Sequence, residues 1–468
     1  MFFVIASDRR ARSNLKIKKD IMKNVKYNDI ERLDIANNKR LIIDPNNVFW
    51  AILSKRHGAG LAPERNALSL YENIRERLDK QMNDFRFGTD LTAIYVDPTD
   101  RCNSNCPYCY VPANLRKNGK SMTKKELIFV LEKAAEYFKG RKKKAVIIFH
   151  ASEPLLVKDV VYEGIQRFDK QFKFGIQTNA TLLENEDIRF LKKYRVGMGI
   201  SLDSSSISIN NRLRRAWNSG GNFGKAVRAI EMFDGYEGLN VITTITKFNV
   251  RSLPDTVEFL HSKKVPCVLL NPLRFTQAPS RALKPDEKVM ARYFIKAVDK
   301  AIVLSKRSGR QIIVGNFANT ILGIIAPEAR RLMCDISPCG GGRCFLTITA
   351  SGEMIPCGEF IGLKGYSGGN IFKTGIADAI QSAPFKKIRG RIVEKIDKCR
   401  TCVVRNICGA PCPAELHSLG DMHAPSVFCE FYKEIIGYAF KLISENREKD
   451  CLRQEGLNDL EYEYRLES

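Results

Sequence analysis

The chain has 468 residues, of which 44% are hydrophobic, so it is long enough to bury two or three cores without metal. Lysine and arginine outnumber aspartate and glutamate by 76 to 52, and the net charge of +24 favours an acidic partner or a well-solvated basic surface. No stretch approaches the roughly 20 apolar residues of a membrane span, and the first apolar run is too short for a signal peptide. We therefore expect a cytoplasmic protein.

Fourteen cysteines are many for this length, and most of them fall into two groups. In a reducing compartment, grouped thiols are more often metal ligands than disulfides. The first group, Cys102, Cys106 and Cys109, lies in CNSNCPYC, and eight other cysteines lie between Cys339 and Cys429. The two groups predict two metal-binding regions.

Residues 1–88 contain no cysteine and are expected to form a small N-terminal domain with both α and β structure. The stretches RLIID (40–44) and VFWAIL (48–53) flank the turn signal DPNN and predict short strands, or a strand and a helix. A charged stretch with helical periodicity, ENIRERLDKQMNDF (72–85), ends this segment.

Residues 89–320 alternate between apolar strand runs and amphipathic helical stretches. This alternation predicts a parallel sheet with helices outside it, in the form of a partial (β/α)6 barrel similar to a TIM barrel. Chemistry in such barrels gathers at the carboxyl ends of the strands, and the cysteine trio directly follows the first one. The strand candidates are LTAIYV (91–96), AVIIF (145–149), FKFGIQT (172–178), VGMGISL (196–202), LNVITTITK (239–247) and VPCVLLN (265–271).

The cysteine-rich region, residues 321–440, has Gly-rich turns and few long periodic segments, so metal is expected to hold it together. In CGGGRCFLTITASGEMIPC (339–357), the alternating residues around Ser351-Gly352 predict a hairpin. The following CRTCVVRNICGAPC (399–412) has the spacing CxxCxxxxxCxxxC. From this spacing alone, a zinc ion is as good a candidate as any other metal group for these cysteines. Residues 441–468 are expected to form a C-terminal helix and an acidic tail.

The cysteine trio supplies one ligand too few for a closed zinc site, whereas a 4Fe-4S cluster held by three thiolates keeps one iron free. With FHASEP, IQTNAT and GISLD after the next three strands, the CxxxCxxC trio resembles the radical S-adenosylmethionine (SAM) superfamily. The resemblance implies that the cluster on Cys102, Cys106 and Cys109 binds SAM at its free iron. It also implies that SAM is contacted by Tyr108, Ala151, Ser152, Glu153, Pro154, Gln177, Thr178, Asn179, Ser201, Asp203 and Arg212.

The second cysteine group, downstream of such a trio, resembles the SPASM domain, which binds two auxiliary 4Fe-4S clusters. The resemblance implies a first auxiliary cluster on Cys339, Cys344, Cys357 and Cys412. It implies a second one on Cys399, Cys402, Cys408 and Cys429, which makes three clusters in all. Cys267, Cys334 and Cys451 are left over, and Cys334 is close enough to the hairpin to compete as a ligand.

The resemblance implies a radical SAM oxidoreductase that matures a peptide. A 5'-deoxyadenosyl radical would abstract a substrate hydrogen and form a thioether (sactionine-type) or another crosslink in a ribosomally synthesised peptide. The expected partners are a precursor peptide with a leader and an electron donor such as flavodoxin or ferredoxin. The N-terminal domain would then be a winged-helix-like domain that binds the leader, or else a helical extension capping the barrel. No nucleic acid and no membrane partner is expected.

Two alternatives remain open from the sequence. One is oxidation of a cysteine or serine to formylglycine, as in anaerobic sulfatase maturation, or another cofactor maturation. Sulfatase-maturating enzymes carry an aspartate directly after the hairpin's last cysteine, where this chain has Gly358 and then Glu359, a candidate catalytic base. The other alternative is a zinc-containing nucleic-acid-binding protein, which would leave FHASEP, IQTNAT and GISLD unexplained.

Overall fold

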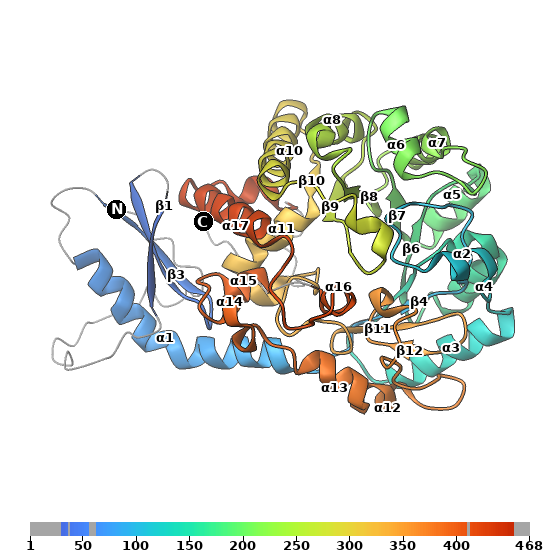
Figure 1. Ribbon diagram of the computed structural model, residues 1–468, viewed down its shortest axis with the longest axis horizontal. Helices are drawn as coiled ribbons and strands as arrows, with labels where there is room; N and C mark the ends of the chain where they lie inside the picture. Colours follow the sequence, from blue (N-terminus) through green and yellow to red (C-terminus); the bar gives the residue numbers. More distant parts are fainter. Residues whose placement is uncertain (1–29, 36–37, 56–61, 410–411, 454–468) are drawn as a thin grey trace.

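A nine-stranded sheet forms the centre of the molecule, in the order β10-β9-β8-β7-β6-β5-β4-β11-β12. The computed structural model describes residues 30–35, 38–55, 62–409 and 412–453 (Figure 1). Strands β4 to β9 are parallel and confirm the six strand predictions. They are β4 (Ala93–Val96), β5 (Val146–Phe149), β6 (Lys173–Thr178), β7 (Gly197–Ser201), β8 (Leu239–Ile245) and β9 (Cys267–Pro272). The predicted partial barrel is therefore confirmed.

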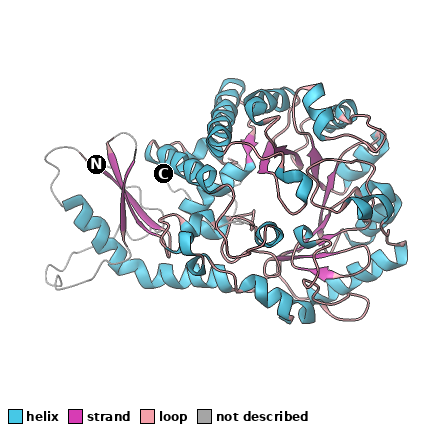
Figure 2. Cartoon of the chain, in the orientation of Figure 1, coloured by secondary structure: helices cyan, strands magenta, loops and turns pink. Residues whose placement is uncertain are grey.

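Alternate residues of each strand face opposite sides of the sheet, as the pleat requires. In β8 the buried residues Val241 and Ile245 pack into the main core, whereas the half-buried Ile242 and Thr244 face the inside of the barrel. The helices between the strands pack on the outer side (Figure 2). Helix α3, for example, begins with a capping box in which Thr123 and Glu126 bond to each other's backbone amides, and it buries Leu127 and Leu131.

The helices that follow the barrel strands are mostly short and amphipathic. They are α2 (Ala113–Asn118), α3 (Lys124–Tyr137), α4 (Lys158–Phe168), α5 (Asn185–Lys193), α6 (Ile207–Leu213), α7 (Phe223–Phe233), α8 (Leu253–Ser262), α9 (Ala278–Arg281), α10 (Glu287–Ser308) and α11 (Gly315–Ile325). Single 3-10 turns are η2 (Pro154–Val157), η3 (Val250–Ser252) and η4 (Pro327–Ala329). Strand β10 (Ile313–Val314) extends the sheet beyond β9.

The predicted hairpin of the cysteine-rich region is present as β11 (Phe345–Ile348) and β12 (Met354–Ile355). Strand β11 pairs in parallel with β4, with Phe345 opposite Ala93, so the hairpin continues the barrel sheet. Short elements connected by turns make up the rest of the region, until a longer helix, α17, closes it. These elements are η5 (Gly358–Phe360), α12 (Ile376–Gln381), α13 (Ala383–Arg389), η6 (Val393–Lys395), α14 (Asp397–Arg400), α15 (Arg405–Cys408), α16 (Pro413–Ser418), α17 (Cys429–Ser444) and η7 (Glu448–Cys451). Helix α17 runs through the predicted boundary at residue 440, and the expected acidic tail lies outside the described residues.

The N-terminal segment forms an antiparallel sheet of β1 (Glu31–Ile35), β2 (Lys39–Asp44) and β3 (Phe49–Ser54), followed by α1 (Ala62–Phe87). The sheet is covered on both faces. Phe49 and Leu53 pack with Leu68 and other residues of α1. On the other face, Trp50 meets the ring of Phe440 edge-on and donates from Nε1 to the carbonyl of Ile324 at 2.9 Å. One helix accompanies this sheet in the described part of the segment.

The C-terminal end of α1 is anchored to the cysteine-rich region. The Arg86 guanidinium binds both carboxylate oxygens of Glu394, at 2.8 and 2.9 Å, and donates to the Ser337 carbonyl at 2.5 Å. Arg343 donates to the carbonyls of Phe85 and Gly88 at the same helix end. Cations beside the carbonyl end of a helix are favourable because they face the negative end of its dipole.

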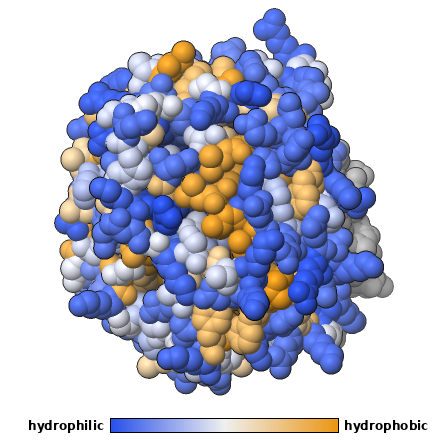
Figure 3. All heavy atoms as spheres, turned by 90° about the vertical axis from the view of Figure 1, so that its right-hand side faces the viewer, coloured by the Kyte–Doolittle hydropathy of each residue, from blue (hydrophilic) through white to orange (hydrophobic). Residues whose placement is uncertain are grey.

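The outer surface agrees with the charged composition. Seen from the right-hand side of Figure 1, it is mostly hydrophilic, with apolar side chains gathered near the middle and in smaller groups elsewhere on this face (Figure 3). Among the helices of the described residues, none combines the length and the apolar content needed to cross a bilayer.

The bidentate pair of Arg86 and Glu394 predicts a measurable contribution to stability. Only 7% of the Arg86 side chain is exposed, so Arg86→Ala leaves a partly buried carboxylate and a carbonyl without their donor. We expect the midpoint of thermal unfolding to fall by at least about 3 °C. Lys80→Ala is the matched control, because Lys80 pairs with Asp84 on an exposed face of the same helix, and it should shift the midpoint by less than about 1 °C. Equal midpoints for the two variants would contradict the anchoring role.

Candidate active site

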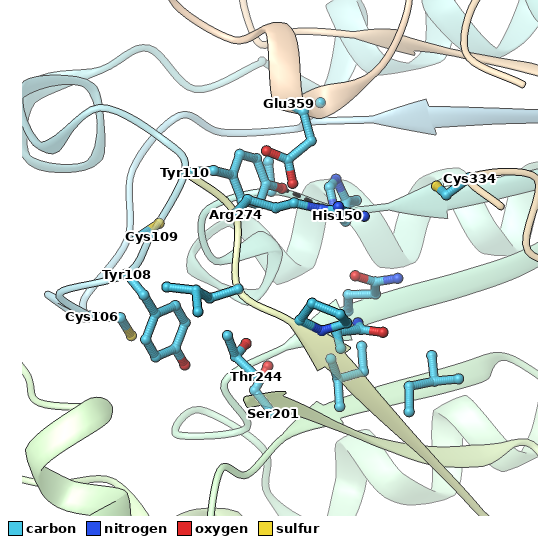
Figure 4. A pocket seen from close by; sticks show the side chains of 18 of the residues that line it. Cys106, Tyr108, Cys109, Tyr110, His150, Ser201, Thr244, Arg274, Cys334 and Glu359 are labelled. Atoms are coloured by element: carbon cyan, nitrogen blue, oxygen red, sulfur yellow. Dashed lines mark hydrogen bonds between the residues drawn. The ribbon is translucent and has the colours of Figure 1, made fainter. Parts of the chain in front are cut away.

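A cavity of about 390 Å³ opens at the carboxyl ends of the barrel strands. Its wall is built from strand-end loops on one side and from the hairpin and α17 on the other. Figure 4 shows Cys106, Tyr108 and Cys109 at one end and Cys334 at the opposite end, with Arg274, His150, Tyr110 and Glu359 between them. Cys357 of the second cysteine group also lines the cavity, so both groups contribute to its wall.

The cysteine trio lies in the loop after β4, and all three side chains line the cavity. The sulfur of Cys102 accepts from the backbone amide of Ser104 at 3.4 Å and from Nδ2 of Asn179 at 3.9 Å. Burial raises the pKa of Cys106 to about 11, although the Arg214 and Arg116 cations lower it. Burial disfavours the thiolate, and binding of a metal in place of the proton favours it. Three thiols in one loop, with N–H···S bonds to Cys102 and the Arg116 and Arg214 cations beside Cys106 and Cys109, fit a 4Fe-4S cluster.

The loop after β5 carries two residues in the left-handed backbone region. Ala151 has φ 53° and Ser152 has φ 36°, and both line the cavity. Ala180, after β6, has φ 63°. These positions correspond to glycines in the motifs that the sequence resembles, since glycine adopts such angles without a steric cost. Ser152 is held by a hydrogen bond from its hydroxyl to the Asp100 carbonyl at 2.6 Å. The loop therefore adopts left-handed backbone angles although alanine and serine replace the glycines.

Glu153 is fully buried and does not line the cavity. It accepts hydrogen bonds from the hydroxyl of Thr178 at 2.7 Å, from the amide of Asn179 at 2.8 Å and from the amide of Leu155 at 3.1 Å. Burial raises its pKa to about 7, and these three bonds oppose the shift. Pro154 is also buried and absent from the cavity wall, so the expected contact of Glu153 and Pro154 with SAM stays a prediction.

The ends of β6 and β7 supply several of the expected side chains to the cavity wall, namely Gln177, Thr178, Asn179 and Ser201. Asp203 is buried behind that wall and organises its neighbours. Its carboxylate accepts from the hydroxyl of Tyr108 and from the amide of Thr244, and it pairs with Nε of Arg214 at 3.0 Å. Asp203 therefore acts on the cavity through Tyr108 and Arg214, both of which line it.

Arg212 does not line the cavity, and its expected role in SAM binding stays a prediction that this position does not favour. It lies on the outer face of α6, exposed, with its guanidinium 3.6 Å from the centre of the Phe248 ring. Arg214, directly after the helix, is buried and lines the cavity. The chain turns inward there because residues 214–217 run beside the trio loop: the Asn105 amide donates to the Arg215 carbonyl at 2.7 Å, and Trp217 Nε1 donates to the Cys102 carbonyl at 2.8 Å.

Polar side chains that the motif analysis missed lie near the hairpin. The hydroxyl of Tyr110 and Nε2 of His150 are 3.1 Å apart, and Nδ1 of His150 lies 3.8 Å from the buried carboxylate of Asp97. Arg274 follows β9 and pairs with Glu415 at 3.6 Å. Tyr110 adjoins Cys109, and His150 precedes the ASEP stretch. Their positions next to these two motifs could have identified them as site residues from the sequence.

Glu359 lines the cavity beside Arg274, as its place after the hairpin suggested. Its carboxylate accepts from the hydroxyl of Thr276 at 3.3 Å. Burial raises the pKa of Glu359 to about 7, and the Arg274 cation lowers it. Glu359 is thus a half-buried carboxyl group on the cavity wall.

The auxiliary cysteines occupy two places. Cys339, Cys357 and Cys412 pack against one apolar cluster, and the amides of Gly341 and Glu359 donate to Cys339 and Cys357. The thiols of Cys399, Cys402 and Cys429 neighbour one another at the start of α17, and Cys408 ends α15, which packs on that helix. Cys344 is buried and absent from the cavity wall, where Cys334 lies instead.

The chain matches two family models: the radical SAM superfamily over residues 96–260, and an iron-sulfur cluster-binding domain, SPASM, over residues 339–403. An uncharacterised protein of Archaeoglobus fulgidus is 42% identical over 433 residues, covering 92% of this chain and 98% of that one. A cysteine-type anaerobic sulfatase-maturating enzyme of Clostridium novyi is 22% identical over 73% of this chain and 93% of its own length.

Two solved structures share the fold. The native anSMEcpe structure with bound AdoMet has a TM-score of 0.67 and 18% identity, covering 76% of this chain and 99% of that one. Streptococcus suis SuiB bound to the precursor peptide SuiA has a TM-score of 0.57 and 15% identity, covering 86% of this chain and 98% of that one. The chain therefore belongs to the radical SAM superfamily, as an enzyme with a SPASM domain that uses 4Fe-4S clusters and S-adenosylmethionine.

Proposed function

We propose that this enzyme modifies a ribosomally made peptide by abstracting a hydrogen atom and forming a thioether or another crosslink. When bound, the cluster on the trio supplies the electron that cleaves SAM to the 5'-deoxyadenosyl radical, and the auxiliary clusters accept the electron that the substrate gives up. The main support for the proposal is that the cavity has the cysteine trio at one end and hairpin residues toward the other. A substrate between the ends would meet the trio on one side and a carboxyl group beside the hairpin cysteines on the other.

The SAM-binding role is proposed for the end of the cavity near the trio. Arg214, held by Asp203, would form a charge-assisted pair with the SAM carboxylate. Ser201 would bond to the ribose, and the left-handed backbone at Ala151 and Ser152 would face the amino group. Glu153 would act as a positioning residue, because it holds the ends of the β5 and β6 loops together.

The proton-accepting role is proposed for Glu359. Thioether formation removes one hydrogen atom from a carbon and one proton from the thiol. When the carbon and the sulfur then join, one electron is released, and the auxiliary clusters would accept it. The hydrogen atom goes to the 5'-deoxyadenosyl group, and the proton needs a base at the cavity wall. Support for Glu359 comes from its place in the wall and from its hydrogen bond to Thr276.

A peptide substrate is supported by the likeness to SuiB, whose solved structure contains a precursor peptide. We propose that the leader of such a peptide binds at the N-terminal sheet. Both faces of that sheet are covered, but β1 is one of its two edge strands, and no strand of the described residues pairs with its outer side. An edge strand offers unpaired backbone groups to an added strand. The electron donor is proposed to be a flavodoxin or a ferredoxin.

A second candidate is oxidation of a cysteine or serine to formylglycine, which needs the same hydrogen abstraction and the same kind of base. Glu359 favours it specifically, because a cavity-facing carboxylate two residues after Cys357 takes the place of the aspartate expected in sulfatase maturation. The two reactions differ in product: a thioether retains the substrate sulfur, whereas formylglycine made from cysteine loses it.

The reaction is tested by co-expressing the enzyme anaerobically with short cysteine-rich peptides encoded beside it. We expect about twelve iron atoms per chain, reductive cleavage of SAM, and a peptide that has lost two hydrogens per modification but no sulfur. Cys106→Ala should lose about four iron atoms and all SAM cleavage, whereas Cys267→Ser, outside both cysteine groups, should retain them. Mass spectrometry that finds sulfur loss would support formylglycine formation instead, and an unaltered peptide would contradict both reactions.

Arg214 and Arg212 offer a matched pair for SAM binding. Arg214→Ala should weaken binding of SAM to the reconstituted enzyme at least about tenfold, since a charge-assisted hydrogen bond contributes roughly 1.5–3 kcal/mol. Arg212→Ala should change the affinity by less than about twofold, the scatter expected of an exposed substitution. Arg214→Lys keeps a cation beside Asp203, and its binding should fall between the two. The assignment fails if the Arg212 variant loses affinity and the Arg214 variant keeps it.

Glu359→Gln separates proton transfer from SAM cleavage. We expect the variant to cleave SAM at the wild-type rate while the rate of peptide modification falls about 100-fold, a typical effect of removing a general base. Glu353→Gln is the control, because Glu353 lies on the same hairpin but outside the cavity wall. Product formation at the wild-type rate in the Glu359 variant would assign the proton to another group.

A further inference from the structure

A buried carboxylate without hydrogen bonds lies behind the wall of the cavity. Asp97 directly follows β4, and only 1% of it is exposed. Neither oxygen of its carboxylate has a hydrogen-bond partner among the described residues. Burial raises the pKa of Asp97 to about 6, while the His150 imidazole opposes this shift and the Asp100 charge adds to it. A buried carboxylate without donors is costly, so a positive charge beside Asp97 is favourable.

The His150 imidazole lies between this carboxylate and the cavity. Its Nδ1 is 3.8 Å from Oδ1 of Asp97, and its Nε2 is 3.1 Å from the hydroxyl of Tyr110. The His150 amide donates to the carbonyl of Val96, the residue before Asp97, at 3.1 Å, which holds the two strand ends together. Figure 4 shows Tyr110 and His150 joined by their hydrogen bond, with Glu359 nearby. The three side chains therefore form a row from the cavity wall to the buried carboxylate.

The turn before Glu359 leaves room for this row. A Cβ atom at Gly358 would lie 3.1 Å from Cε1 of His150 and 3.6 Å from the hydroxyl oxygen of Tyr110. The first contact is tight for a Cβ atom, so the missing side chain lets the imidazole approach the turn. Glu359 comes next in the chain, and its charge adds to the effect of burial in raising the pKa of Tyr110. Glu359 is therefore a close neighbour of this row.

We propose that Tyr110, His150 and Asp97 form a proton relay in the wall of the active site. The relay takes up the proton that Glu359 removes from the substrate. Glu359 gives this proton to the hydroxyl oxygen of Tyr110, while the hydrogen that Tyr110 already carries moves to Nε2 of His150. One O–H bond forms on Tyr110 as another breaks, so Tyr110 stays neutral and the added proton ends on the imidazole. Asp97 then faces an imidazolium, which lowers the cost of burying its carboxylate.

The position of the hydrogen on the His150 ring decides whether this relay can operate. With the hydrogen on Nδ1, facing Asp97, Nε2 is free to accept from Tyr110. With the hydrogen on Nε2, or on both ring nitrogens, the imidazole cannot take a proton from Tyr110. The relay rests on the proposed role of Glu359 as the base, whereas the state of the His150 ring can be measured without a substrate.

The first experiment measures that state by NMR in the oxidised, fully reconstituted enzyme labelled with nitrogen-15 histidine. The chain has five histidines, and His150→Gln identifies the His150 signal by its absence. We expect long-range proton–nitrogen spectra at about pH 8 to show the hydrogen on Nδ1, and Asp97→Ala should lower that fraction because the neighbouring negative charge is lost. A hydrogen on Nε2 alone, or on both nitrogens, in the wild type would overturn the relay. Cys106→Ala replaces the wild type if a paramagnetic cluster hides the signal.

The second experiment measures how many peptides are modified for each 5'-deoxyadenosine formed, with the peptide that the wild type modifies on co-expression as the probe. His150→Gln and Tyr110→Phe should each lower this ratio at least about tenfold, because each interrupts the relay while Glu359 remains. His423→Gln is the control, an exposed histidine outside the cavity wall, and should stay within about twofold of the wild type. Wild-type ratios in the folded His150 and Tyr110 variants would overturn the relay. A wild type that modifies no peptide would contradict the proposed function instead, and the NMR result would still decide whether His150 can accept a proton.

Asp97→Asn separates a role in the relay from a role in folding. Removal of a buried charge without hydrogen bonds should leave the midpoint of thermal unfolding unchanged or raise it. The ratio of modified peptide to 5'-deoxyadenosine should nevertheless fall, because the imidazolium loses its counter-charge. A fall in the midpoint with an unchanged ratio would show that Asp97 maintains the fold and would overturn its place in the relay.

Discussion

The pairing of β11 with β4 is the contact on which the active site depends. Backbone hydrogen bonds from Thr92 to Cys344 and from Asp97 to Ile348 hold the two strands in parallel register. Strand β12 returns antiparallel to β11, and Cys357 and Glu359, which follow it, line the same cavity as the trio after β4. Without this pairing, the cysteine-rich region would be a separate metal domain. With it, Glu359 and the hairpin cysteines become part of the barrel's own active site.

The walls of this cavity are held by buried charges that are well paired. Glu153 receives three hydrogen bonds from two loops, and Asp203 receives two while pairing with Arg214. A buried carboxylate is costly unless its lone pairs are satisfied, so each one fixes the groups that satisfy it.

Loops at the strand ends reach their shape without the glycines expected there. Ala151, Ser152 and Ala180 all have positive φ, which costs an L-residue about 1 kcal/mol or more. The surrounding hydrogen bonds, such as that of Ser152 to Asp100, hold the strained backbone in place. The replacement of glycine therefore did not remove the left-handed backbone conformation of these loops. The sequence alone could not decide this. Backbone conformation here is decided by tertiary contacts as well as by residue type.

The sequence by itself determined the features that depend on short-range spacing and periodicity. These are the six barrel strands, the hairpin, the cysteine trio after β4, and the presence of Glu359 at the hairpin's end. Only the tertiary structure decided which member of a nearby pair faces the cavity. Arg214 rather than Arg212 turns inward because the segment after α6 runs along the trio loop. Cys334 lines the cavity and Cys344 is absent from its wall, a difference that spacing along the chain cannot specify.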